Sequence, residues 1–281
     1  MYDGSDVFSP FKFMINRSDL MQIIYVLAGV KPAVRFGISE KYFKYLRKTF
    51  GALGLFVMKS NFYVRDQITC RGAKYTYSRS FSPVSKDPQI FVYVSKDKAL
   101  CLTLRESEMH NDDISFGKLL GYPECCVEHF ASHRYTKPGD FFISTLHEQE
   151  CSSFSFLNNF ALCIFDIKIL CHYPCSPDCA RSLKLAGMYL KVLRSRFSAY
   201  AAFLKRQLKS MIICTRSGSL VYSNKYSKRG QKIVFDEING QMGDPLFKMV
   251  SGNEFVNIGR NGVKVGNKTL KDANTKIILY E

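Results

Sequence analysis

The stretch GKLLGYPECCVEHFASH, residues 117–133, marks the point at which the sequence becomes helical. Pro123 is suited to open a helix, and Glu124 suits the positive end of the helix dipole. The adjacent Cys125 and Cys126 would then lie near the third and fourth helical positions. Free N–H groups at a helix start favour thiolate over thiol. The stretch therefore predicts a helix that begins with two ionisable sulfur atoms.

A second cysteine segment, CHYPCSPDC, occupies residues 171–179. Ser176 is predicted to cap a helix, with Pro177 as its first residue. Cys179 would lie in the first turn, and Cys175 just before the cap. Both groups of thiols are thus predicted at helix N-termini.

Together the two segments could supply four sulfur ligands to zinc or to an iron–sulfur cluster. These ligands are Cys125, Cys126, Cys175 and Cys179. Neighbouring residues point ~100° apart on a helix, so two adjacent cysteines on one ion would be strained. His129 lies on the same predicted helix face as Cys125, and an alternative zinc site uses it in place of Cys126. Cys171 is a further candidate ligand.

The same residues also permit metal-free thiol chemistry. In that hypothesis Cys126 is a nucleophile that its neighbour resolves as a disulfide, and His172 is an acid–base group. Sequence signatures of serine hydrolases, phosphate loops and dinucleotide-binding loops are absent.

The two segments resemble a prokaryotic family known as a domain of unknown function, with the patterns G-Y-P-x-C-C-V-x-x-F and H-x-P-C-S-x-x-C-x-x-S. The resemblance covers roughly residues 110–200. It implies that the shared residues form one site. Besides the four cysteines and His172, these are Gly121, Tyr122, Pro123, Pro174 and Ser176.

Composition restricts the class of protein. The 281 residues are 46% hydrophobic, yet no segment approaches the ~18–20 apolar residues of a membrane span. The N-terminal residues do not resemble a secretory signal. A soluble, cytoplasmic protein without a membrane partner is expected, and its ten cysteines are better explained by metal or thiol chemistry than by disulfides.

The charge is strongly positive, at +16, and Arg181–Phe235 contains thirteen Lys and Arg but no Asp or Glu. Such a balance favours polyanionic partners, for example a nucleic acid. One long amphipathic helix is predicted from Pro177 to about Met211. Its basic face would bind the polyanion through Lys184, Lys191, Arg194, Lys205 and Lys209. The alternative is a solvated helix face.

The predicted fold is α+β, with a mixed α/β domain at residues 1–110, a helical cysteine-motif core at 111–212 and a small β-rich domain at 213–281. QIFVYVS (89–95) and ALCLTLRE (99–106) are predicted to form a hairpin. Three functions stay open. The first is a cysteine-ligated metal or iron–sulfur protein, which could also be an enzyme that acts on an anionic substrate such as a nucleic acid. The second is a metal-free thiol enzyme, and the third is a nucleic-acid-binding module with structural cysteines.

Overall fold

The mixed α+β fold predicted from the sequence is present in the computed structural model, including the strand-rich C-terminal region. The structure describes residues 15–68, 75–83, 85–133, 145–146, 153–215, 218–259, 262–271 and 275–281. By its contacts the chain divides into two units. One comprises residues 1–69, 75–132 and 188–200, and the other comprises 70–74, 133–187 and 201–281. The three domain ranges predicted from the sequence remain predictions.

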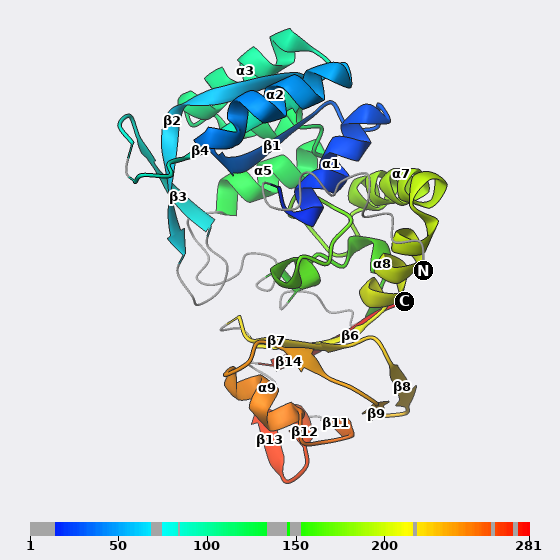
Figure 1. Ribbon diagram of the computed structural model, residues 1–281. Coiled ribbons are helices and arrows are strands. Elements are labelled where there is room, and N and C mark those ends of the chain that lie inside the picture. The colour runs from blue at the N-terminus through cyan, green and yellow to red at the C-terminus, as the bar shows by residue number, and fades with distance from the viewer. Residues whose placement is uncertain are drawn as a thin grey trace. The chain divides into compact units, whose positions relative to one another are not determined.

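A four-stranded antiparallel sheet with strand order β1–β4–β2–β3 forms the centre of the first unit (Figure 1). Its strands are β1 (Ala33–Ser39), β2 (Phe56–Ile68), β3 (Tyr75–Ser80) and β4 (Gln89–Ser95). The helices of this unit begin with α1 (Arg17–Leu27), η2 (Glu40–Tyr42), α2 (Phe43–Ala52) and α3 (Lys98–Met109). They continue with α4 (Asp113–Leu119) and α5 (Glu124–His133).

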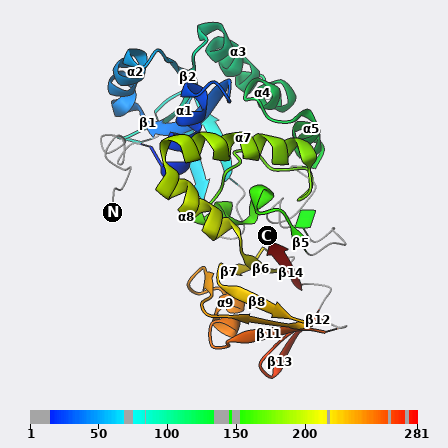
Figure 2. The same ribbon diagram turned by 90° about the vertical axis from the view of Figure 1, so that its right-hand side faces the viewer.

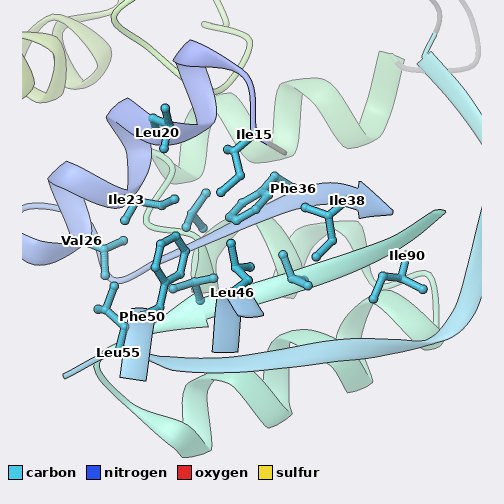
Figure 3. Packing of buried hydrophobic residues seen from close by; sticks show 13 residues of the cluster. Ile15, Leu20, Ile23, Val26, Phe36, Ile38, Leu46, Phe50, Leu55 and Ile90 are labelled. Carbon is cyan, nitrogen blue, oxygen red and sulfur yellow. The ribbon is translucent and has the colours of Figure 1, made fainter. Parts of the chain in front are cut away.

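Strand β4 explains why helices cover both faces of this sheet. Its side chains alternate between faces, as they must in a strand. Ile90, Val92 and Val94 join one core with residues of α1 and α2, which Figure 3 shows at close range. Phe91 and Tyr93 point into a second core that includes residues of α3. The five central residues of the strand, 90–94, are apolar or aromatic because they are buried on both faces of the sheet.

The predicted hairpin of residues 89–95 and 99–106 is wrong in its second half, because residues 98–109 form helix α3. The alternation in ALCLTLRE resembles a strand, but Asp97 caps the helix by accepting from the N–H of Ala99 at 2.8 Å. Cys101, Leu104 and Glu108 are buried with helical spacing. The helix cap and the three- to four-residue spacing of the buried side chains therefore favour a helix over a strand.

Two further corrections concern the same unit. The sequence of LGLFVMKS and NFYVRD predicts two strands joined by a turn, but Phe56–Ile68 is one strand, β2. Its pairing with β4 shifts between Lys59 and Tyr63. An extra-residue irregularity of this kind bends a strand without ending it. The predicted strand FKFMI lies mostly outside the described residues.

The second unit contains two five-stranded sheets, ordered β10–β7–β6–β14–β5 and β13–β12–β11–β9–β8. The first sheet has β5 (Ser153–Phe154), β6 (Met211–Thr215), β7 (Leu220–Ser223), β10 (Asn239–Gly240) and β14 (Thr275–Tyr280). The second has β8 (Tyr226–Arg229), β9 (Lys232–Phe235), β11 (Phe255–Gly259), β12 (Gly262–Val265) and β13 (Lys268–Lys271). Figure 2 shows the strands of this unit and helix α9 (Pro245–Val250). Both sheets and this helix contribute residues to one apolar core.

The sequence also predicts a helical stretch over roughly 140–170, and the structure bears this out only in part: residues 145–146 are helical. Residues 153–165 form the short strand β5 and two 3-10 helices, η3 (Phe156–Asn158) and η4 (Ala161–Phe165). Residues 140–144 and 147–152 lie outside the described part of the chain.

The single long helix predicted from Pro177 to Met211 is two helices, α7 (Ala180–Arg196) and α8 (Ser198–Leu208). No proline or glycine marks the break at Phe197. Ser195 lies close before it, and its hydroxyl donates to the Val192 carbonyl at 2.9 Å. Such bonds compete with the helical ladder and bend helices. No helix among the described residues is long and apolar enough to cross a membrane.

The cap of α3 can be tested by substitution. Asp97→Ala removes the acceptor of the Ala99 N–H, and we expect it to lower the free energy of unfolding by about 1 kcal/mol in urea titrations. Asp97→Asn keeps an acceptor and should stay close to the unmodified protein. Equal stability of Asp97→Ala and the unmodified protein would contradict the cap.

Candidate metal centre

The turn Gly121–Pro123 leads the chain from α4 into α5, and it requires glycine. Gly121 has φ +79°, a conformation that costs other residues about 1–2 kcal/mol. The space is also closed, because a Cβ atom at this position would lie 2.5 Å from Cδ of Pro32. Backbone bonds from Gly121 to Lys118 and from Tyr122 to Gly117 complete the turn.

Lys31 holds the same turn from the other side. Its side chain is buried, with 2% of the residue exposed. Its ammonium group donates to the carbonyl of Leu120 at 2.7 Å and lies 4.4 Å from the ring centroid of Tyr122. Leu120 is the C-cap of α4, where the negative end of the helix dipole favours a cation. Lys31 and Pro32 therefore fix the residues that immediately precede the cysteine helix.

Helix α5 starts one residue later than Pro123, whose carbonyl accepts from Cys126 at 2.9 Å and Val127 at 3.0 Å. Cys125 and Cys126 are therefore the second and third helical residues, still in the first turn. Cys126 is 1% exposed and Cys125 is half-buried. Their sulfur atoms lie 4.0 Å apart. Because the two sulfur atoms already lie this close, both can reach one ion without the strain expected for adjacent cysteines.

The second cysteine segment differs from the prediction, because α7 begins at Ala180 and not at Pro177. The first helical hydrogen bond runs from Leu183 to the carbonyl of Cys179, at 2.9 Å. Cys179 therefore occupies the cap position that was predicted for Ser176. The Ser176 hydroxyl instead donates to the carboxylate of Asp178.

Asn158 fixes the backbone of this segment. Its side-chain amide donates to the carbonyls of Ser176 at 3.0 Å and Pro177 at 2.9 Å, and the residue is fully buried. The carbonyl of Ser176 also accepts from the N–H of Cys179 at 3.2 Å, so side-chain and backbone bonds together fix the turn that precedes α7. The sequence analysis missed both Asn158 and Lys31, because nothing in their local sequence reveals a partner so distant in the chain.

The structure brings together the four cysteines that the sequence analysis grouped. The sulfur atoms of Cys125, Cys126, Cys175 and Cys179 all lie within 4.8 Å of one another. Cys126 and Cys179 are buried, and the other two are half-buried. Four sulfurs in a tetrahedron around zinc would be about 3.8 Å apart, given zinc–sulfur bonds of ~2.3 Å. The cluster therefore could hold a metal after small side-chain movements.

The other predicted site residues play different parts. Within the described chain, the metal-compatible group includes neither His129 nor Cys171. His172, the predicted acid–base group, is buried, and its Nε2 lies 2.9 Å from the hydroxyl of Ser182. Cys101 is a buried thiol outside the group, and burial, followed by the charge of Asp97, raises its pKa to about 12.

The five predicted polyanion-binding residues lie on two helices. Lys184, Lys191 and Arg194 are exposed on α7, whereas Lys205 is half-buried on α8 and Lys209 is exposed directly after that helix. The sequence also predicts a buried apolar stripe beneath them, formed by Leu190, Leu193, Phe197 and Leu204. The three leucines are buried, whereas Phe197 is half-buried.

The fold and the cysteine cluster define an α+β protein with a possible thiolate metal site. Residues 86–208 match a family model described as a protein of unknown function (DUF483), which confirms the resemblance inferred from the two motifs. No curated protein and no solved structure shows significant similarity to the chain. The matched range includes all four clustered cysteines but not Lys31 or Pro32.

The closed space at Gly121 gives a prediction with a matched control. Gly54 has φ +74°, but no atom lies within 4 Å of the position that a Cβ atom would take there, so Gly54→Ala should cost about 1–2 kcal/mol from conformation alone. Gly121→Ala should lower stability further, because its methyl group meets Pro32. Denaturant unfolding of both variants measures the difference.

The double variant Gly121→Ala with Pro32→Ala removes the atom that the new methyl group would meet. It should recover part of the stability lost in Gly121→Ala. Equal losses for Gly54→Ala and Gly121→Ala would contradict the contact.

Proposed function

We propose that the chain is a metal protein in which Cys125, Cys126, Cys175 and Cys179 bind a single ion. The observation that carries the proposal is the mutual distance of the four sulfur atoms, 4.8 Å or less. Cysteine thiolates at this spacing match the ligand set of structural zinc sites.

Electrostatics supports a bound cation. Two unit charges about 4.8 Å apart repel by roughly 1 kcal/mol in water and by roughly 3–4 kcal/mol at an effective dielectric constant of 20. Four thiolates form several such pairs, so they are stable together only when a cation neutralises them. A divalent ion at their centre turns this repulsion into attraction, and binding it stabilises the folded state.

The spacing favours a single ion over an iron–sulfur cluster. A cluster places several iron and sulfide ions between its cysteines and therefore separates their sulfur atoms further than one ion does. All four ligands would come from the protein, which is typical of zinc sites that stabilise a fold and leave no open position for substrate. We therefore place zinc first and an iron–sulfur cluster second.

A thiol enzyme is the second candidate. Its support is the 4.0 Å distance between the sulfur atoms of Cys125 and Cys126, with Cys125 half-buried and Cys126 fully buried. In that function the thiolate of Cys126 attacks a disulfide of the substrate and releases one of its two thiols. Cys125 then displaces the second thiol as the Cys125–Cys126 disulfide forms, so that the substrate disulfide is reduced and the cysteine pair is oxidised. A reducing compartment such as the cytoplasm suits both candidates, because it would keep closely spaced thiols from oxidising.

We also infer a polyanionic partner, a nucleic acid, for the basic span that includes α7 and α8. The net charge of +16 and the acid-free span Arg181–Phe235 support it. Such binding should weaken steeply as salt rises, because every neutralised phosphate releases counterions.

The metal proposal predicts different outcomes for different cysteines. The anaerobically purified protein should contain about one zinc per chain, and Cys175→Ser or Cys179→Ser should lose most of it, because serine is a poor zinc ligand. Cys101→Ser and Cys214→Ser are matched controls, since both thiols are fully buried outside the cluster. They should keep the metal and lose about 1–2 kcal/mol of stability. From sequence, Cys70 is expected to behave like these two controls, but it lies outside the described residues.

Metal analysis with visible absorption separates the candidates. Stoichiometric zinc supports the proposal, visible absorption with iron supports a cluster, and neither metal leaves thiol chemistry. Full metal content in Cys175→Ser and Cys179→Ser would contradict the site altogether.

A second pair of variants distinguishes the two zinc ligand sets. If Cys126 is a ligand, Cys126→Ser loses zinc and His129→Ala keeps it. The reverse result would assign His129 in place of Cys126. The two variants lie three residues apart on α5, so any shared loss of helix structure would appear in both circular dichroism spectra.

A further inference from the structure

Helix α8 and Lys209, the residue that follows it, present three cations to one surface hollow of about 380 Å³. Its lining residues are Ala202, Lys205, Arg206, Lys209 and Asn224. Lys205 and Lys209 are one helical turn apart and therefore face the same side. Asn224 follows strand β7 and adds an amide, which can donate hydrogen bonds. The lining contains no acidic residue.

One aromatic ring holds two of these cations in place. The ammonium groups of Lys205 and Lys209 lie 5.8 Å and 5.6 Å from the ring centroid of Phe156 in η3. Phe156 is itself tied to the C-terminal strand region, since its N–H donates to the carbonyl of Glu281 at 3.0 Å. Cation–π contacts therefore restrict two long side chains and reduce the entropy that they would lose on binding an anion.

These cations are not neutralised by acids in the described part of the chain. None of the ion pairs found there includes Lys205, Arg206 or Lys209. Three like charges within five residues of the chain repel one another, and an anion that binds among them relieves this repulsion. A neighbouring hollow on β8 and β9 contains Lys225 but also Asp236, so the acid-free hollow is the stronger anion site.

An exposed aromatic residue on the same helix points to the kind of anion. Phe203 is 36% exposed, and the guanidinium carbon of Arg206 lies 5.8 Å from its ring centroid. Cations beside an exposed ring are the combination by which proteins bind single-stranded nucleic acid, the cations contacting phosphates and the ring stacking on a base. Inorganic polyphosphate would use the cations and leave the ring without a role.

We propose that the α8 hollow binds the backbone phosphates of a single-stranded nucleic acid, with Phe203 as a stacking platform. The proposal rests on the polyanionic partner inferred above and is independent of the metal. Arg206 suits the fork-like recognition of phosphate oxygens, and the two lysines act as point charges. The proposal adds Arg206, Asn224 and Phe203 to the predicted polyanion-binding residues, and it excludes the basic residues of α7 from the site.

Two triple variants of the full-length protein test this assignment. The first changes α8 by Lys205→Gln, Arg206→Gln and Lys209→Gln. The second changes α7 by Lys184→Gln, Lys191→Gln and Arg194→Gln, with the same loss of charge. Anisotropy of a labelled oligouridylate of about 16 nucleotides would be followed across a series of salt concentrations.

The α8 variant should bind at least about tenfold more weakly, and the slope of log affinity against log salt should fall by about 2, or ~0.7 for each lost contact. The α7 variant should stay within about twofold of the unmodified protein, since none of its three residues lines the hollow. Phe203→Leu should weaken RNA binding and leave competition by inorganic polyphosphate unchanged. Circular dichroism spectra and metal content must be the same in all variants and in the unmodified protein.

If the triple change on α8 prevents folding, the single change Arg206→Gln, at an exposed residue, should lower the salt slope by about 0.7.

Each contrary result has a separate meaning. Equal losses in the two triple variants would show that net charge alone binds RNA, and would overturn the α8 site while the polyanionic partner stands. No RNA binding at low salt would overturn both, without touching the metal site. An unchanged RNA affinity in Phe203→Leu, with polyphosphate binding lost in the α8 variant, would assign the hollow to polyphosphate and overturn the nucleic-acid assignment.

Discussion

A lysine ammonium group that leaves water needs compensating acceptors, and Lys31 finds them at the turn before the cysteine helix. It donates to the carbonyl of Leu120 and lies over the ring of Tyr122. The acceptor is a free carbonyl at the C-terminus of α4, so hydrogen bond, helix dipole and cation–π attraction all act in one direction. Because Pro32 also contacts Gly121, the connection from α1 to β1 determines where α5 begins.

This arrangement has a consequence for the cysteines. Cys125 and Cys126 lie only a few residues beyond the turn, so small shifts of Gly121 would displace both sulfur atoms. Asn158 plays the corresponding part for the other segment by holding the carbonyls of Ser176 and Pro177. Metal ligands are commonly oriented by such supporting contacts. The cluster thus depends on residues that carry no metal-binding chemistry of their own.

The sequence predicted those features that local chemistry decides. The two cysteine segments could be grouped because prolines and acidic residues beside the thiols indicate helix starts, and the strand β4 followed from its apolar run. Local patterns gave wrong secondary structure where one pattern fits both a helix and a strand, or where a helix ends without a breaking residue. ALCLTLRE alternates like a strand, yet the cap at Asp97 makes it a helix, and the break at Phe197 has no proline or glycine to announce it. Lys31 and Asn158 could not be predicted, because each acts through a partner chosen by the tertiary fold.

The sequence also cannot show which of the basic residues bind an anion. The span Arg181–Phe235 is uniformly basic in sequence, and by composition each lysine in it is an equal candidate for binding an anion. The structure makes them unequal. Lys191 and Arg194 are exposed on α7, whereas Lys205 and Lys209 share the ring of Phe156 and line one hollow with Arg206. An exposed lysine loses side-chain entropy when it binds, but a lysine already restricted by an aromatic ring loses less. Affinity for a phosphate chain should therefore concentrate where the cations are held in advance, and the break between α7 and α8 separates these two kinds of basic surface.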